Sequence, residues 1–389
     1  MAAYLDASAT APLHPAAQQA MLRVWSQGQA NASSLHSAGA RAAQEVDAAR
    51  ELIASAFGIH PGGVIFTSGG TEANNLGIIG QVLAMRSAQK VLTSQVEHSS
   101  VLASCAYLNR FHGVQVGYVP VDATGRFVLD AALEAELATG QVNLMALGLA
   151  NAEVGSVNDA HRLLELAGEH RVSLHLDAVQ AAAQLPVSLK AGAWPGEGVT
   201  SMAIASHKFG GPQGVGALLL PRPVPLEPTM HGGSQEGGLR AGTLNVAGIA
   251  GFAAAVGAHL ASVGSKAVAL LRSKDELVQA MLREVPGAQL TGHASERLPG
   301  HASFVFEGVS GESLLVALDA AGYAASSGSA CRAGSQGPSP VLTAMGFDED
   351  LALSALRFSL AEPLAAEDRQ RIVGIIKDEV ARAQGTGPR

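Results

Sequence analysis

The sequence predicts an α/β fold in which a mainly parallel sheet carries helices on both of its faces. Between residues 63 and 220, short apolar runs alternate with stretches that have helical spacing. Unusual polar residues follow several of these runs, at the sheet edge where proteins of this class bind ligands. A chain of 389 residues, 48% of them hydrophobic, is too long for one compact unit, so we expect a second domain.

The elements alternate in a regular order along the first part of the chain. Helical spacing covers residues 15–27 and 38–57, with a polar turn at 30–36 between them. Apolar runs predict strands at 63–67, 90–94, 115–120, 141–149, 172–176, 199–205 and 215–220. Helices are expected from the glycine turn at 68–72 to about residue 87, after His98, and at 129–137 and 160–170. Strands separated by helices in this way are expected to be mainly parallel.

The chain changes character after residue 220. A glycine-rich loop at 230–243 is long enough to be either functional or disordered. A helix-rich span at 244–284 leads to a smaller α+β region, with strands at 302–306 and 355–360 and a helix at 312–321. We therefore expect an N-terminal segment, 1–14, that packs with the small domain, a large domain, 15–260, and a small C-terminal domain, 261–389.

Composition argues against several classes of protein. The 25 basic residues are outnumbered by 33 acidic ones, and a net charge of −8 gives no electrostatic footprint for nucleic acid. The start of the chain lacks the basic and apolar regions of an export signal. The apolar stretch at 246–263 is mostly alanine and glycine, which favours a buried helix over a membrane span. Two cysteines cannot form a disulfide framework, so a cytoplasmic protein is expected.

Lys208 is the most informative single residue. It lies just beyond the apolar run at 199–205 and is followed at once by glycines, which allow a backbone or a ligand to approach closely. A partly desolvated lysine has a lowered pKa, and its free amine can bond to a carbonyl group, as in pyridoxal phosphate (PLP) enzymes. A lysine at a strand end is more often a solvated surface residue, so its neighbours must decide between the two interpretations.

Other polar residues at strand ends allow a functional and a structural interpretation. Asp177 ends an apolar strand, where a carboxylate needs a cation such as a protonated pyridine nitrogen or an arginine. The turn at 68–72 can offer backbone amides and the Thr71 hydroxyl to a phosphate, or can simply cap a helix. His98 can stack on a flat cofactor and relay protons, or can cap the helix that follows it.

Two candidates lie in the C-terminal region. Cys331 belongs to a run of small residues beside Arg332, where a thiol has thiolate character and can act as a nucleophile, although it could equally be a bystander. Arg357 alternates with apolar residues on a strand, which suits bidentate binding of a carboxylate or a buried ion pair.

Together these segments resemble the cysteine desulfurases, a branch of the class V aminotransferase family of fold-type I PLP enzymes, and among them the first group of NifS-like and IscS-like proteins. The likeness runs from Tyr4 to about residue 380. The motifs that carry it are Thr67-Ser68-Gly69-Gly70-Thr71-Glu72, Glu97-His98, Asn151 with Glu153 and Gly155, Asp177-Ala178-Val179-Gln180, His207-Lys208, Arg240-Ala241-Gly242-Thr243, Ser326 to Cys331, and Arg357-Phe358-Ser359. The resemblance implies a seven-stranded sheet and a homodimer.

The resemblance also assigns roles to the matching residues. Lys208 would bind PLP covalently and move protons at the substrate's α-carbon, while Asp177 would keep the ring nitrogen protonated. His98 would stack on the ring, and Cys331 would take the sulfur of L-cysteine as a persulfide, with alanine released. Gln180 would contact the ring hydroxyl, and Asn151 and Arg357 would bind the substrate carboxylate. The phosphate would be held by Gly70, Thr71, Ser206 and His207, together with Thr243 from the other subunit.

An acceptor protein for the sulfur is implied, either a scaffold for iron–sulfur cluster assembly or a thiolation partner. No resident metal is expected, and Cys331 would meet an iron–sulfur cluster only during transfer. The alternatives are a selenocysteine lyase, another class V aminotransferase, or a catalytically silent scaffold with the same fold.

The sequence departs from the family pattern at several positions. Ala205 stands where the family usually has a serine, which removes one phosphate hydroxyl, and Ser206 could compensate. Ala152 replaces an asparagine, and Ala30-Asn31-Ala32 replaces an early Gly-Asn-Pro. Pro340 takes the place of a larger residue and bears on how the Cys331 segment docks.

Overall fold

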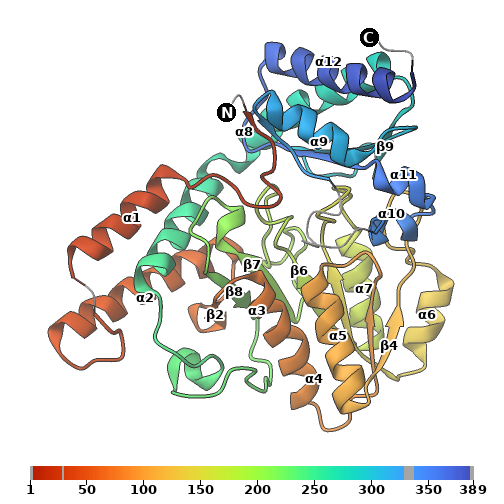
Figure 1. Cartoon of the computed structure of the whole chain (residues 1–389). Coiled ribbons are helices and arrows are strands. Elements are labelled where there is room, and N and C mark those ends of the chain that lie inside the picture. Colours follow the sequence, from red (N-terminus) through yellow and green to blue (C-terminus); the bar gives the residue numbers. More distant parts are fainter. Residues whose placement is uncertain (1–2, 29, 328–336, 386–389) are drawn as a thin grey trace.

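A seven-stranded sheet forms the centre of the computed structural model, which describes residues 3–28, 30–327 and 337–385 (Figure 1). In spatial order its strands are β2 (Val64–Thr67), β8 (Gly216–Leu219), β7 (Ser201–Ala205), β6 (Ser173–Asp177), β5 (Val142–Gly148), β3 (Lys90–Thr93) and β4 (Gln115–Tyr118). β8 alone runs antiparallel to its neighbours. The predicted α/β fold with a mainly parallel, seven-stranded sheet is confirmed.

Helices cover both faces of this sheet, which explains why the inner strands are buried on both sides and mainly apolar. On one face, α3 (Gly70–Asn75), α4 (Gln81–Ala84) and α5 (Ser99–His112) pack on the sheet. On the other face lie α2 (Ser37–Phe57) and α7 (Ala160–His170). Leu144 of β5 packs with the first group and Met145 with the second, as the alternation of side chains along a strand requires.

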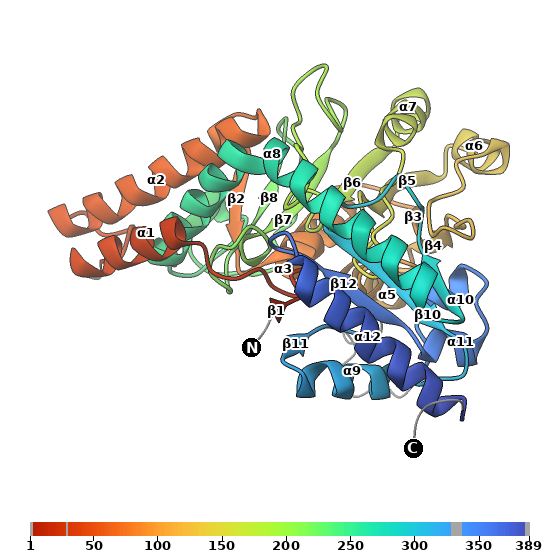
Figure 2. The same cartoon turned by 90° about the horizontal axis from the view of Figure 1, so that it is seen from above.

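A second apolar core is built around a smaller antiparallel sheet of β12 (Leu356–Ser359), β10 (His301–Phe306) and β9 (Ala288–Thr291). Helices α9 (Gly311–Ala320) and α12 (Ala366–Ala383) cover it (Figure 2). The N-terminal strand β1 (Ala3–Tyr4) pairs with β11 (Tyr323–Ala324), and Leu5 packs in this second core.

Helix α8 (Val246–Glu284) connects the two cores. Its first half packs on α1 (Pro15–Ser26) and α2, and its second half adds Leu270 and Leu277 to the smaller core. Within the described residues it is the one helix that is long and apolar enough to cross a membrane, but its buried first half is that of a core helix. It passes residue 260 without a break, so the division into domains at that point stays a prediction.

Sequence reasoning placed most elements within a few residues and missed the shortest ones. The single helix predicted to run to about residue 87 ends at Ala84 and contains a π-helical turn, Leu76–Gly80. Strands β1, β9 and β11, and the short helices α6 (Ala131–Ala138), α10 (Pro340–Ala344) and α11 (Glu349–Leu353), complete the chain. Of these only α6 had been predicted, because two- to five-residue elements carry too little periodicity.

Candidate active site

One cavity of about 510 Å³ lies beyond the carboxyl ends of β5, β6 and β7. Its walls bring together predicted residues from distant parts of the chain: Gly70, Thr71, His98, Asn151, Asp177, Gln180, His207, Lys208 and Arg357. This is the position at which open parallel sheets bind ligands, because the loops that follow the strands all open on the same edge.

Asp177 lies on the cavity wall at the end of β6, and both of its carboxylate oxygens have donors. Oδ1 accepts a hydrogen bond from the backbone N–H of Val179 at 3.0 Å. Oδ2 accepts one from Nδ2 of Asn74, on α3, at 2.7 Å. No arginine pairs with Asp177 among the described residues, so the alternative of a structural Asp–Arg pair finds no support there.

Lys208 follows β7 and points toward the N-terminal segment. Its ammonium group donates to the backbone oxygen of Ser8 and, at 2.8 Å, to that of Ala9. The side-chain amide of Gln180 donates to the same Ser8 oxygen at 2.9 Å. Residues 8 and 9 therefore cover the lysine end of the cavity, a contact that no local sequence pattern indicates.

His98 is the N-cap of α5 and also faces the cavity. Its Nδ1 accepts from the backbone N–H of Ser100 at 3.1 Å and lies 2.7 Å from the Ser100 hydroxyl. The structural role that the sequence left open, a helix cap, is therefore present. It uses only one ring nitrogen and leaves the other for a ligand.

The end of the cavity near α3 has the donors that a phosphate needs. Gly69, at φ 158°, caps α3 without a side-chain hydrogen bond, which leaves the first amides of the helix unpaired by a cap. His207 also lines the cavity, and its buried Nδ1 has no hydrogen-bond partner among the described residues. Burial, and secondarily the charge of Lys208, lowers the pKa of His207 to about 4, so its ring is neutral at pH 7.

Ser206 does not reach this cavity, contrary to expectation. Ala205, the last residue of β7, lies on the cavity wall, whereas Ser206 begins a 3-10 turn, Ser206–Lys208, and of that turn only His207 and Lys208 line the cavity. Its hydroxyl is buried against Gly211 and has no hydrogen-bond partner among the described residues. Ser206 therefore does not replace the serine hydroxyl that Ala205 lacks.

Arg357 on β12 reaches the opposite side of the cavity. It is almost fully buried, donates from Nη2 to Asp6 at 2.7 Å and from Nη1 to the backbone oxygen of Ala152 at 3.1 Å, and has no partner for Nε among the described residues. Asn151 lies beside it and uses its Oδ1 to accept the backbone N–H groups of Glu153 and Val154. Arg357 thus forms the ion pair that sequence allowed, while its Nε is the guanidinium nitrogen without a hydrogen-bond partner among the described residues.

Glu97 lines the cavity next to His98, and sequence reasoning gave it no separate role. Its Oε1 accepts from the backbone N–H of Gly148 at 2.8 Å. Burial, reinforced by the negative charge of Asp177, raises the pKa of Glu97 to about 8. The carboxyl group is therefore mainly protonated at pH 7.

The far wall of the cavity is formed by Pro340 and Val341 at the start of α10. Ser339 caps α10 by accepting from Leu342 N–H at 3.1 Å, and its hydroxyl donates to Glu153. This contact holds α10 against the loop after β5. The predicted nucleophile, Cys331, lies outside the described residues, whereas the other cysteine, Cys105, is buried, and burial raises its pKa to about 12.

Thr243 lies in a different hollow, of about 400 Å³, between α1, α2 and the start of α8. Asn31 and Arg41 line the same hollow. The glycine-rich loop before Thr243 is held by two ion pairs, Arg50 with Glu236 at 2.6 Å and Arg240 with Glu72 at 2.8 Å. Thr243 thus does not join the cavity of its own chain.

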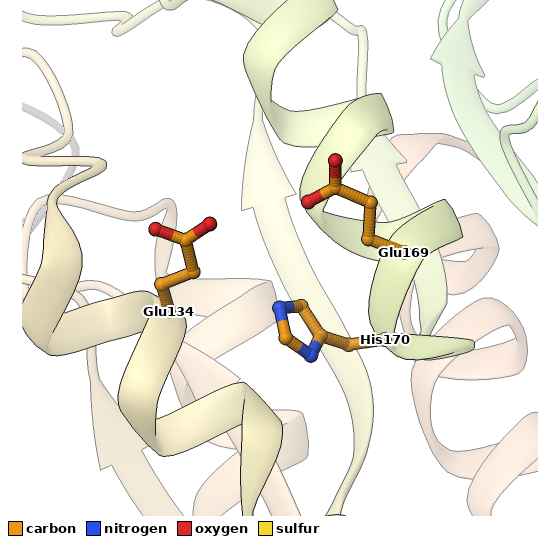
Figure 3. A group of neighbouring side chains, drawn as sticks. All are labelled: Glu134, Glu169 and His170. Atoms are coloured by element: carbon orange, nitrogen blue, oxygen red, sulfur yellow. The ribbon is translucent and has the colours of Figure 1, made fainter.

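One group of side chains outside the cavity has the spacing of a metal site. Glu134 on α6 and Glu169 and His170 on α7 turn toward one another (Figure 3), with their ligand atoms within 4.8 Å. Glu134 also pairs with Arg162 at 3.3 Å, a cation that already balances part of the charge. None of the three residues lines the cavity, and the expectation of no resident metal stays a prediction.

Sequence reasoning missed two residues at the cavity, Asn74 and Glu97 as a protonated acid, and it also missed Asp6, the partner of Arg357. Asn74 lies four residues after Gly70 on a helix, so the two share a face, and that spacing was a usable signal. The ion pair between Asp6 and Arg357 joins positions 351 residues apart, which no pattern within one segment can reveal.

Known proteins are similar to this chain along almost its whole length. The family described as Aminotransferase class-V matches residues 3–372. The IscS-like cysteine desulfurase of Mycobacterium tuberculosis (strain ATCC 25618 / H37Rv) is 41% identical to the chain over 98% of the chain and 97% of its own length. A solved structure of a NifS-like protein superposes with a TM-score of 0.88 at 29% identity, over 98% of this chain and 100% of that one. A structure described as SspA in complex with cysteine gives a TM-score of 0.79 at 28% identity, over 93% and 99% of the two chains.

Proposed function

The chain belongs to the class V aminotransferase family, as its motifs predicted, and on that basis we propose that it is a PLP-dependent cysteine desulfurase. It would convert L-cysteine to L-alanine and transfer the sulfur to Cys331 as a persulfide. The observation that carries the proposal is one cavity in which the amine of Lys208, the carboxylate of Asp177 and the guanidinium of Arg357 all take part in the wall.

The residues around the cavity fit PLP by their chemistry. The amides at the start of α3, Thr71 and the unpartnered Nδ1 of His207 would hold the phosphate. Asp177 would hold a proton on the ring nitrogen, and Gln180 would contact the ring hydroxyl. When bound, PLP supplies a ring that withdraws electrons from the substrate's bonds.

The chain's own groups would bind and orient L-cysteine. Arg357, whose Nε–H has no partner in the part of the chain that the structure describes, and Asn151 would fix the substrate carboxylate. Lys208 would attach PLP covalently and, once released by the substrate, would move a proton at the α-carbon. His98 would cover one face of the ring and exclude water, while its Nε2 remains available for proton transfer.

The sulfur would then leave Cys331 for an acceptor protein, for use in iron–sulfur cluster assembly or thiolation. The same proposal includes a cytoplasmic location, no binding to nucleic acid or membrane, and a homodimer in which Thr243 reaches the phosphate site of the partner. The position of Thr243 in a separate hollow supports the dimer, because within one chain it lines none of the main cavity.

Mass spectrometry after addition of L-cysteine tests the proposal. We expect the tryptic peptide that contains Cys331 to gain one sulfur atom while alanine forms in step. The matched control is Cys331→Ala, which should bind PLP but release no sulfur, whereas an aminotransferase would be unaffected by this change. A purified protein that stays colourless with PLP would contradict the enzyme and favour a silent scaffold.

A further inference from the structure

A continuous chain of buried hydrogen bonds runs beneath the cavity and meets at Asn74. Nδ2 of Asn74 donates to Asp177 Oδ2 at 2.7 Å and to the hydroxyl of Ser100 at 2.9 Å. That hydroxyl lies 2.7 Å from Nδ1 of His98. A single amide group therefore contacts, directly or through one hydroxyl, both of the residues proposed to face the PLP ring.

The chain continues away from the cavity through three more buried side chains. Oδ1 of Asn74 lies 3.0 Å from Nε2 of His175, whose Nδ1 lies 2.7 Å from the hydroxyl of Ser201. Nε2 of Gln81 donates to that hydroxyl at 2.6 Å. These four residues are at most 1% exposed, so water does not compete for their hydrogen bonds.

The partners fix the direction of every hydrogen bond. Nε2 of Gln81 also donates to the backbone oxygen of Gly77, which sets the orientation of that amide, and Ser201 must then give its own hydrogen to Nδ1 of His175. Burial lowers the pKa of His175 to about 3, so the ring is neutral and its proton lies on Nε2, facing Oδ1 of Asn74. The amide of Asn74 is thereby held with its N–H groups toward Asp177 and Ser100.

The same reasoning assigns the tautomer of His98. Ser100 accepts from Asn74 and gives its hydroxyl hydrogen to Nδ1 of His98, which also accepts the Ser100 backbone N–H. Nδ1 therefore carries no proton, and in the neutral ring the proton lies on Nε2.

We propose that Asn74 is a positioning residue. It orients the carboxylate of Asp177 toward the cofactor and, through Ser100, fixes the tautomer of His98, while His175 holds Asn74 in the required orientation. The inference rests on the proposed function and names no further group that touches the reacting atoms. A charge-assisted hydrogen bond to Asp177 is worth about 1.5–3 kcal/mol, which corresponds to about 10- to 150-fold in affinity for a ligand that depends on it.

Asn158 provides a matched control. It is a second buried asparagine that lines the cavity, at 5% exposure. Its side chain accepts from Phe127 N–H at 3.0 Å and donates to the Gly148 oxygen at 2.9 Å, both backbone groups. Asn158→Ala thus removes another buried amide whose hydrogen bonds reach neither Asp177 nor His98.

The test is a titration of the full-length protein, freed of cofactor, with PLP, followed by its visible absorbance band over a range of pH. We expect Asn74→Ala to weaken PLP binding at least 10-fold and to shift the pH midpoint of the band, whereas Asn158→Ala should stay within about 3-fold with the midpoint unchanged. Urea unfolding of each variant separates this effect from lost stability. Asn74→Leu, of similar volume but without a donor, serves if the alanine variant does not fold.

A double-mutant cycle tests the role of His175. His175→Ala should weaken PLP binding in the wild-type background, and it should have little effect when Asn74 is already alanine, because the residue would act only through Asn74. His175→Gln supplies an amide N–H in place of the imidazole N–H, so it should bind PLP more tightly than His175→Ala. Equal losses in both backgrounds would overturn the role of His175.

The outcomes for Asn74 separate the inference from the proposed function. A wild-type protein that binds PLP while Asn74→Ala binds it within 3-fold, with an unchanged pH midpoint, overturns the inference alone. If Asn74→Ala weakens PLP binding as predicted but the wild-type protein forms no alanine from L-cysteine, the desulfurase is overturned and the positioning role stays intact. A wild-type protein that does not bind PLP overturns both.

Discussion

The ion pair between Asp6 and Arg357 allows a quantitative prediction, because the chain offers a second pair of the same length in a different environment. Nη2 of Arg357 lies 2.7 Å from Asp6, with the two side chains 2% and 22% exposed. Nζ of Lys266 lies 2.7 Å from Glu362, with the side chains 38% and 77% exposed. Distance is equal in the two pairs, so they differ in burial and in the residue types that form them.

Asp6→Ala would leave two nitrogens of the buried Arg357 guanidinium without a hydrogen-bond partner among the described residues. Nη2 would lose Asp6, and Nε already has no partner. Removing one partner of a fully buried pair costs about 3–5 kcal/mol, and an exposed pair is worth about 0–1 kcal/mol. Because Asp6 is partly solvated, we expect Asp6→Ala to lower the free energy of unfolding by about 2–3 kcal/mol. Asp6→Asn, which keeps an acceptor, should lower it by about 1 kcal/mol.

Urea unfolding of the cofactor-free protein measures these losses, with Glu362→Gln as the control, for which we expect less than about 0.5 kcal/mol. Arg357 would also lose the contact that aims it at the cavity, so the KM for L-cysteine should rise about 10-fold in Asp6→Ala while kcat changes less. The reasoning is refuted if Asp6→Ala loses no more stability than Glu362→Gln and its KM is unchanged.

Three further predictions concern Glu97, Gly70 and Cys105. Because the pKa of Glu97 is raised to about 8, the folded protein binds one more proton than the unfolded chain between about pH 4.5 and 8. The free energy of unfolding of the wild-type protein, relative to that of Glu97→Gln, should therefore fall by up to about 1.4 kcal/mol per pH unit across that window. A difference in urea midpoints that does not change with pH would contradict this. A Cβ on Gly70 would lie 2.7 Å from Val179 Cγ2, so Gly70→Ala should weaken PLP binding, and Val179→Ala in the same chain should restore it. Cys105 is buried with a pKa raised to about 12, so in Cys331→Ala a thiol reagent should label the chain only after unfolding; labelling of the folded variant would show that Cys105 is accessible.

Alternation of apolar runs and helical spacing was enough to predict the fold, because each strand and the helix beside it carry their own periodic signal. Position at a strand end was enough to predict Asp177, Lys208 and Asn151, since parallel strands bring their carboxyl ends to one edge. Ser206 also follows a strand but does not line the cavity, because the chain turns into a 3-10 helix there and brings His207 and Lys208 to the wall instead.

Contacts between distant segments set the limit of what could be predicted. The Asn74–His175 hydrogen bond joins α3 to β6, and the two residues are 101 positions apart in the sequence. Taken alone, each is an ordinary polar residue in an apolar stretch. Only the pairing of the two explains why neither is left with an unsatisfied group at zero to 1% exposure. Such compensation is a property of the folded arrangement and has no signature in either segment.

The N-terminal segment shows why the two cores act on one site. Leu5 packs in the smaller core, Asp6 pairs with Arg357, and the backbone oxygens of Ser8 and Ala9 accept from Lys208. Five consecutive positions thus connect the small sheet, the proposed carboxylate-binding group and the proposed cofactor-binding lysine. A shift of the small core relative to the large sheet would move Arg357 and the cover over Lys208 together, so the two ends of the cavity cannot be altered independently through this segment.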